Sequence, residues 1–139
     1  MRLKPSFRYA IYAIVAFLTL TGAVWFVADW QKDLSTDEIW QQIAANMLML
    51  HGGAAMLALL LLGALIPMHV LRAWRAGKNR ISGSMMATFS AALILTAFGL
   101  YYLGSESLRP WISWTHIVAG LALALWLPLH IWLGRRQQR

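Results

Sequence analysis

Four long apolar stretches, separated by short polar segments, dominate the pattern of this chain. They cover residues 9–28, 39–74, 85–103 and 110–133. An α-helix rises about 1.5 Å per residue, so roughly 20 apolar residues cross the hydrocarbon core of a bilayer. Each stretch is close to that length or longer. The pattern predicts an all-α membrane protein, a four-helix up-and-down transmembrane bundle that forms a single domain over residues 1–139.

The first stretch follows a basic segment, as a secretory signal does. However, it is longer than the apolar core of a signal peptide and shows no small-residue cleavage site. We therefore expect it to stay in the membrane as the first span. At 60% hydrophobic residues, the composition of the whole chain agrees with a membrane protein that contacts lipid.

The charged residues predict the orientation of the spans. The N-terminal segment, the second loop and the C-terminal tail contain ten basic residues and no acidic one. These are Arg2, Lys4, Arg8, Arg72, Arg75, Lys78, Arg80, Arg135, Arg136 and Arg139. All five acids lie in the first and third loops, with only two basic residues: Asp29, Asp33, Asp37, Glu38 and Glu106 beside Lys32 and Arg109. The positive-inside rule then places both termini in the cytoplasm, and spans two and four run in the same direction.

All four histidines of the chain lie in the second and fourth stretches. His51 and His69 belong to the second, and His116 and His130 belong to the fourth. No Asp, Glu, Lys or Arg lies between the two histidines of either pair. An ionisable side chain inside a membrane span is costly, so it indicates a functional site by default.

The spacing of the histidines predicts how they meet. At about 100° per residue, the 18 residues from His51 to His69 make about five turns, so both rings leave one face of the helix. The 14 residues from His116 to His130 fall about 40° short of four turns, which again gives one face. If the two helices are parallel, His51 meets His116 near the outer surface. His69 then meets His130 near the inner surface.

Two facing imidazoles inside a helical bundle are the ligand set of a six-coordinate haem iron. The histidines have two alternative interpretations: ordinary polar groups at the membrane interface, or ligands of zinc or copper. Zinc and copper sites normally need three or four protein ligands close together, whereas a porphyrin already supplies four nitrogens to iron. The chain has no cysteine, so iron–sulfur clusters and covalently attached haem are excluded. Any haem is therefore a non-covalent b haem.

The inner histidines share a local pattern, because a proline lies two residues before each of them. Pro67 precedes His69, and Pro128 precedes His130. Proline lacks the N–H that bonds the preceding turn, so each should disturb its helix and permit a kink. Such bends are a way to absorb the one-turn difference between the two spacings.

Two further features concern the surroundings of the rings. A ligating imidazole should donate its other N–H to a carbonyl or hydroxyl, and Ser113 and Thr115 are near His116 in the sequence. Gly22 lies within the first span. It either allows close helix packing or leaves clearance for a flat porphyrin.

The four histidines, their spacing and the four-span topology resemble those of the small di-haem b-type cytochromes of bacterial inner membranes. That family includes quinone-linked cytochromes b, the superoxide oxidase, and cytochrome b subunits of dehydrogenases and hydrogenases. The resemblance implies two b haems and transmembrane electron transfer that links the quinone pool to a redox partner. Relatives often place ligands on other helices too. Here the first and third spans contain no histidine, so we assign the ligands from the spacing.

A quinone site is expected at one membrane surface, and Arg109, Trp111 and Trp114 beside His116 are its candidate residues. An aromatic wall and a cationic donor suit a quinone ring and its carbonyl. The alternative is an ordinary interfacial belt of aromatic residues.

Several functions remain open at this point. The outer loops have an excess of acid, which disfavours collection of the superoxide anion and favours docking of a basic periplasmic redox protein or a partner subunit. Superoxide oxidation with quinone reduction remains an alternative. A non-redox anchor or assembly subunit is another, and the sequence does not decide whether the chain is itself an enzyme. Net charge is +7, but the basic residues flank membrane spans, which argues against nucleic-acid binding.

Overall fold

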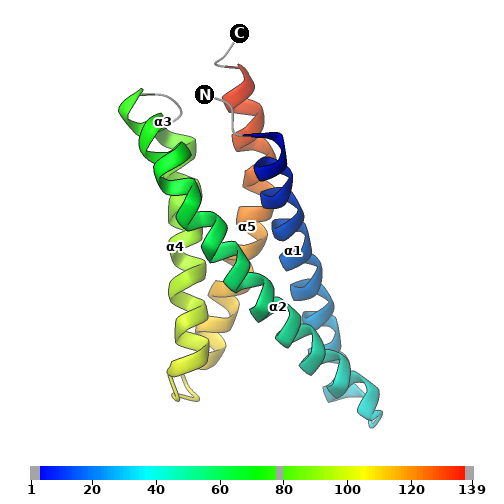
Figure 1. Ribbon diagram of the computed structural model, residues 1–139. Helices are drawn as coiled ribbons and strands as arrows, with labels where there is room; N and C mark the ends of the chain where they lie inside the picture. Colours follow the sequence, from blue (N-terminus) through cyan, green and yellow to red (C-terminus); the bar gives the residue numbers. More distant parts are fainter. Residues whose placement is uncertain (1–3, 78–79, 137–139) are drawn as a thin grey trace. The chain divides into compact units, whose positions relative to one another are not determined.

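The computed structural model describes residues 4–77 and 80–136, and nearly all of them are helical (Figure 1). The elements are α1 Pro5–Leu34, α2 Glu38–Leu65, the π-helical turn η1 Ile66–Val70, α3 Leu71–Arg75, α4 Arg80–Tyr102 and α5 Arg109–Arg136. Four helical segments are long and apolar enough to span a membrane: α1, the run Glu38–Arg75, α4 and α5. The described residues contain no strand. The predicted all-α class with four membrane-length helices is confirmed, and a four-helix bundle fits these spans.

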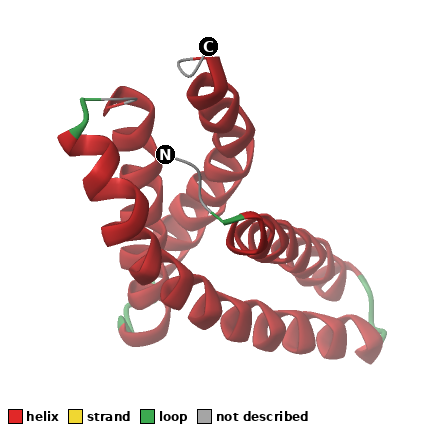
Figure 2. Cartoon of the chain, turned by 45° about the horizontal axis from the view of Figure 1, so that its top comes forward, coloured by secondary structure: helices red, strands yellow, loops and turns green. Residues whose placement is uncertain are grey.

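The chain divides into two compact units, Met1–His69 and Val70–Arg139. In the first unit α1 packs against α2, and in the second α4 packs against α5. Figure 1 and Figure 2 show each pair as an antiparallel helical hairpin. We call them the first hairpin and the second hairpin. The up-and-down topology of the whole chain, and its organisation as one domain, stay predictions.

The helices extend beyond the apolar stretches that predicted the spans. The first runs from Pro5 to Leu34 rather than over residues 9–28, and α4 begins at Arg80 rather than at 85. The apolar stretch predicts only the part of the helix that lies in the hydrocarbon core of the membrane. The helical hydrogen bonds continue into the flanking polar residues until the backbone geometry no longer allows them. Pro5 suits the start of α1 because the first helical N–H needs no partner. Gly77 (φ 68°) follows the C-cap of α3 in the left-handed conformation that commonly ends a helix.

The helix that begins with α2 changes from α-helical to π-helical hydrogen bonding around Pro67. This proline cannot donate the N–H bond to the preceding turn, and Ile66–Val70 form a π-helical turn there. Pro128, by contrast, lies inside the continuous helix α5. The predicted disturbance of the backbone is therefore confirmed at Pro67, and at Pro128 the helix continues unbroken.

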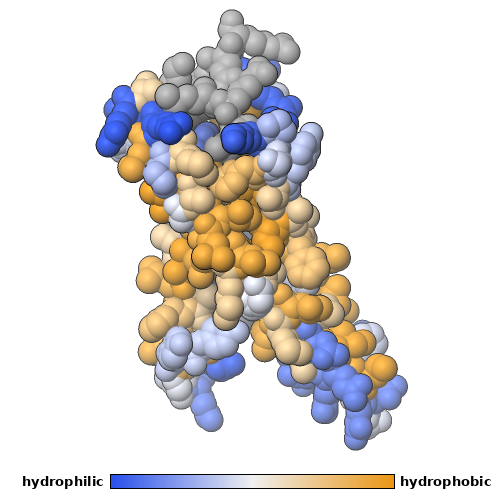
Figure 3. Space-filling view, viewed as in Figure 1, coloured by the Kyte–Doolittle hydropathy of each residue, from blue (hydrophilic) through white to orange (hydrophobic). Residues whose placement is uncertain are grey.

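The buried side chains of the spans are small. The buried side chains among the described residues are Thr21, Ala28, Ala44, Ala54, Ser82 and Ala119. Large apolar side chains are exposed along the spans, and hydrophilic residues gather at the helix ends (Figure 3). Inside a bilayer the hydrophobic effect does not drive helices together. Small residues at the contact let the helix backbones approach closely, and large apolar side chains are favourable in contact with the lipid hydrocarbon.

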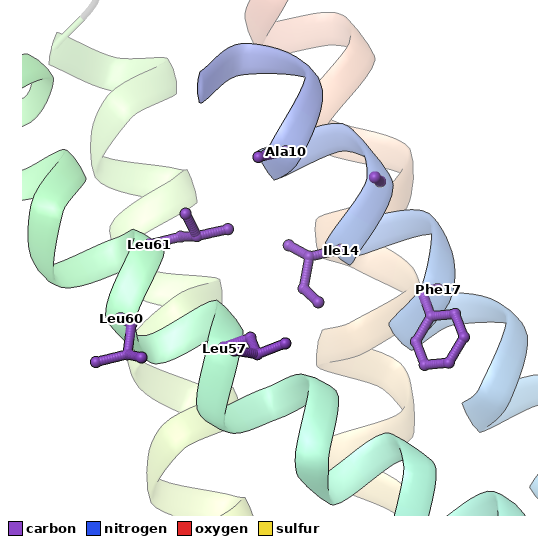
Figure 4. A pocket seen from close by; sticks show the side chains of 7 residues that line it. Ala10, Ile14, Phe17, Leu57, Leu60 and Leu61 are labelled. Carbon is purple, nitrogen blue, oxygen red and sulfur yellow. The ribbon is translucent and has the colours of Figure 1, made fainter. Parts of the chain in front are cut away.

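A groove of about 540 Å³ opens within the first hairpin, between α1 and α2 (Figure 4). Its lining is Ala10, Ala13, Ile14 and Phe17 from α1, with Leu57, Leu60 and Leu61 from α2. The groove has no charged or hydrogen-bonding side chain in its wall. The first hairpin is therefore closed around the buried Thr21 and open toward the N-terminal end of α1.

Candidate functional site

His51 lies on α2 and reaches a hydroxyl on the neighbouring helix. Its Nδ1 is 3.0 Å from Oγ1 of Thr21 on α1. The same hydroxyl lies 2.8 Å from the carbonyl oxygen of Phe17 and 3.2 Å from that of Leu18. A threonine hydroxyl has one hydrogen, and we assign it to the nearer contact, the carbonyl oxygen of Phe17. Oγ1 therefore accepts from Nδ1–H of His51, and this assignment puts the ring lone pair on Nε2.

Gly22 lies directly against the His51 ring. A Cβ added at Gly22 would be 3.4 Å from Cε1 of His51 and 3.6 Å from Nδ1. The glycine thus allows the close packing that the sequence suggested, and the group it accommodates is the imidazole itself. Clearance for a porphyrin stays a prediction.

His116 on α5 has the same surroundings in the second hairpin. Its Nδ1 is 2.8 Å from Oγ1 of Thr96 on α4. This hydroxyl lies 2.6 Å from the carbonyl oxygen of Ala92 and 3.2 Å from that of Leu93. With the hydrogen assigned to the helix backbone in the same way, Nδ1 of His116 donates and Nε2 carries the lone pair. Both hairpins therefore present a histidine whose orientation is set by a threonine of the preceding helix.

His130 is held by a different hydroxyl near the other end of the second hairpin. Its Nδ1 is 3.1 Å from Oγ of Ser82 on α4, and Ser82 is buried. The indole Nε1–H of Trp126 donates to the backbone carbonyl of the same serine at 3.3 Å. Ser82 thus connects the start of α4 to two side chains on α5.

His69 lies inside the π-helical turn rather than in a regular α-helix. A π turn closes with one residue more than an α turn. His69 is therefore rotated from the position that an unbroken helix would give it relative to His51. The π turn corresponds to one inserted residue, against the four-residue difference between the two spacings, and the shared face of His51 and His69 stays a prediction. π turns in α-helices are frequently found at functional sites.

The four rings are half-buried in the structure, and each hairpin holds two of them. Within either hairpin, the described residues bring no three His, Cys, Asp or Glu side chains together. A tetrahedral zinc site needs four ligands and most copper sites need at least three. An iron porphyrin needs only two imidazoles from the protein, because the porphyrin supplies four nitrogens. The pairing of His51 with His116, and of His69 with His130, joins the two units and stays a prediction.

Arg109 has a structural role at the start of α5. Its Nη1 donates to the carbonyl oxygen of Leu100 at 3.2 Å, which is one of the last carbonyls of α4 and has no partner within that helix. Trp111 and Trp114 are 75% and 57% exposed. These three candidate quinone-site residues thus share one helix end, where the arginine caps α4 and the indoles are accessible.

Acidic side chains concentrate where α1 meets α2. Lys32 forms an ion pair of 2.6 Å with Asp29, so the single cation of this segment is already paired. Asp33, Asp37 and Glu38 are exposed around the same connection. This end of the first hairpin therefore presents net negative charge to its surroundings.

The hydroxyl partners of the histidines were not identified from the sequence. Ser113 and Thr115 were expected near His116, but the hydroxyl of Thr115 donates to its own helix at Trp111, 2.7 Å away. Thr96, 20 residues earlier in the chain, is the partner. The available signal was the presence of threonine or serine in otherwise apolar spans that contain no histidine.

Comparisons of the chain with protein-family models, with curated proteins and with solved structures gave no match.

Proposed function

We propose that the chain is a membrane electron carrier that binds two non-covalent b haems. His51 and His116, the outer pair, ligate one haem, and His69 and His130, the inner pair, ligate the other. The observation that carries this proposal is the matched Thr–His geometry of the outer pair. A haem-ligating imidazole typically binds through one nitrogen and hydrogen-bonds through the other, and Thr21 and Thr96 accept from Nδ1 in this way.

The arrangement follows if the four spans alternate in direction. The helices that contain the histidines then run in parallel, and the rings meet as two levels. Among the described residues, the basic side chains near the N-terminus, around α3 and at the end of α5 favour a cytoplasmic location for these ends. Arg2, Lys78 and Arg139 belong to the same charge pattern but lie outside the described residues. We place the protein in the bacterial inner membrane on this basis.

A haem with two imidazole ligands supplies a one-electron carrier whose iron has no open coordination position. The residues of the chain position the two haems and control their surroundings. The histidines fix the two carriers at different depths, the threonines orient the outer rings, and the apolar helices exclude water. Electron passage between the two membrane surfaces, rather than chemistry on a bound substrate, is the function that this arrangement supports.

A purified sample tests this function directly. The full chain should show the visible spectrum of low-spin b haem, and pyridine haemochrome analysis should give two haems per chain. A quinol analogue should reduce them, since the carrier is proposed to exchange electrons with the quinone pool near Arg109, Trp111 and Trp114. A colourless, correctly inserted protein would instead support the alternative of a non-redox anchor or assembly subunit.

The acidic end of the first hairpin favours a basic redox protein, or a partner subunit, as the outer electron partner. Asp33, Asp37 and Glu38 are exposed, and the Lys32–Asp29 pair leaves no other cation in this segment. A negative surface accelerates the association of a positively charged partner and repels the superoxide anion. We therefore rank protein docking above superoxide oxidation.

Stopped-flow mixing with a basic soluble cytochrome c, added outside right-side-out vesicles, checks both the partner and the orientation. Electron exchange should be fast at low salt and slow as ionic strength rises, because exposed charges are screened. The triple change Asp33→Asn, Asp37→Asn and Glu38→Gln should remove most of this salt dependence. Near-diffusion-limited reduction by superoxide would reverse the ranking, and exchange only in inside-out vesicles would reverse the orientation.

A further inference from the structure

The two threonines that contact the outer pair differ from other threonines of the same two hairpins. Thr19 on α1 and Thr115 on α5 make the same hydroxyl bond to a backbone carbonyl four residues earlier, at 2.8 and 2.7 Å. Both are exposed. Thr21 also bonds to its own helix, but it is only 3% exposed and its second contact is a histidine nitrogen. The back-bond is therefore general, and the imidazole contact is specific to two positions.

We propose that Thr21 and Thr96 are positioning residues that fix the Nδ1–H tautomer of His51 and His116 before any cofactor is bound. This inference rests on the proposed function for its consequence, which is that the outer pair is preorganised for iron at Nε2. Each hydroxyl gives its hydrogen to a backbone carbonyl, so it is an acceptor toward the ring. With Nε2–H instead, the hydroxyl would have to turn from its backbone carbonyl and donate to Nδ1, which gives up the bond to Phe17 or Ala92.

The inner histidines have different surroundings. His130 contacts a serine hydroxyl, and His69 lies in the π turn. Two hydrogen bonds of equivalent geometry, one in each hairpin, are thus a property of the outer level. An acceptor on Nδ1–H also makes the imidazole a stronger donor to iron, which favours the oxidised state. The threonines should therefore act on the outer haem, whose proposed ligands they contact.

A purely structural role is the competing explanation, because hydroxyls also connect helices in membranes. Thr→Val variants separate the two roles, since valine keeps the shape and removes the acceptor. Thr21→Val and Thr96→Val are the test variants. Thr19→Val, on the same helix as Thr21, and Thr115→Val, beside His116 on α5, are the controls. Thr21→Ser and Thr96→Ser restore the hydroxyl without the methyl group.

The first readout needs no haem. Histidine ¹⁵N NMR of the full chain, made without haem and measured where imidazole is neutral, should show Nδ1–H for His51 and His116. Each valine variant should move its own histidine toward the Nε2–H form, while the control and serine variants keep Nδ1–H. An unchanged tautomer in Thr21→Val and Thr96→Val would overturn the proposal, and so would loss of Nδ1–H in the serine variants.

The second readout uses the haem-loaded protein. The valine variants should raise the midpoint potential of the outer haem and weaken its binding roughly tenfold to a hundredfold, the usual cost of removing a partner of a metal ligand. The inner haem should keep its potential. A chain that never takes up haem would contradict the proposed function while leaving the tautomer result valid. Equal shifts in the control variants would instead show a general loss of structure.

Discussion

Under the proposed function, His51→Ala protein is expected to keep one of two haems, and His116→Ala protein is expected to lose the same one. Each change removes one of the two axial nitrogens, and iron held by a single imidazole loses both affinity and its low-spin spectrum. His69→Ala and His130→Ala should together define the other haem. The measurements are pyridine haemochrome content and a redox titration of each purified variant.

Double variants test directly which histidines hold the same haem. His51→Ala combined with His116→Ala should be no worse than either change alone, because both act on one site. His51→Ala combined with His130→Ala should remove both haems. Met49→Ala is the control, because Met49 is an exposed side chain two residues from His51 on the same helix. If His51→Ala and His130→Ala abolish the same haem, the pairing by membrane level is wrong.

Gly22→Val is expected to disrupt the outer site, whereas Gly22→Ala should be tolerated. An alanine Cβ would meet the His51 ring at 3.4 Å, which is ordinary van der Waals contact. The additional methyl groups of valine extend beyond Cβ toward the ring and should displace the imidazole from Thr21. We expect roughly tenfold to a hundredfold weaker binding of the outer haem, as for other losses of ligand support.

Gly63→Val is the matched control for this change. A Cβ at Gly63 meets nothing within 4 Å, so valine there carries the same change in helix propensity without a contact to the ring. Haem content and the potential of the outer haem should stay as in the unchanged protein. Unaltered haem binding in Gly22→Val would show that the imidazole can shift without consequence, and the close approach would then be only packing.

The membrane-spanning helices could be predicted because long apolar stretches are enough to identify them. Four apolar stretches gave four helices, and the errors lie at the ends, where helices continue into polar sequence. The π turn at Ile66–Val70 was only partly predictable. Pro67 indicated a disturbed backbone, but Pro128 occupies the same position relative to its histidine and α5 is continuous. The outcome depends on how the neighbouring turns adjust to the hydrogen bond that proline cannot make. The identity of the residue alone does not specify this adjustment.

The histidines could be found from the sequence, but their supporting residues could not. Four ionisable side chains in apolar spans are conspicuous, and helical spacing is simple arithmetic. Thr21 and Thr96 are unremarkable in the sequence, because threonine is common in membrane helices and satisfies itself by bonding to its own backbone. Only the packing of one helix on the next shows that two of these hydroxyls face an imidazole while Thr19 and Thr115 do not.

His51, His116 and His130 each have a hydrogen bond to a hydroxyl of their own hairpin, and this has a consequence for biogenesis. A helical hairpin can leave the translocation machinery as a unit, with its own polar contacts already satisfied. These three rings are then oriented as soon as their hairpin has entered the bilayer, before the other hairpin arrives. The cofactor, under the proposed function, is the last component to be added, and it acts as the cross-link that converts two separately inserted hairpins into one protein.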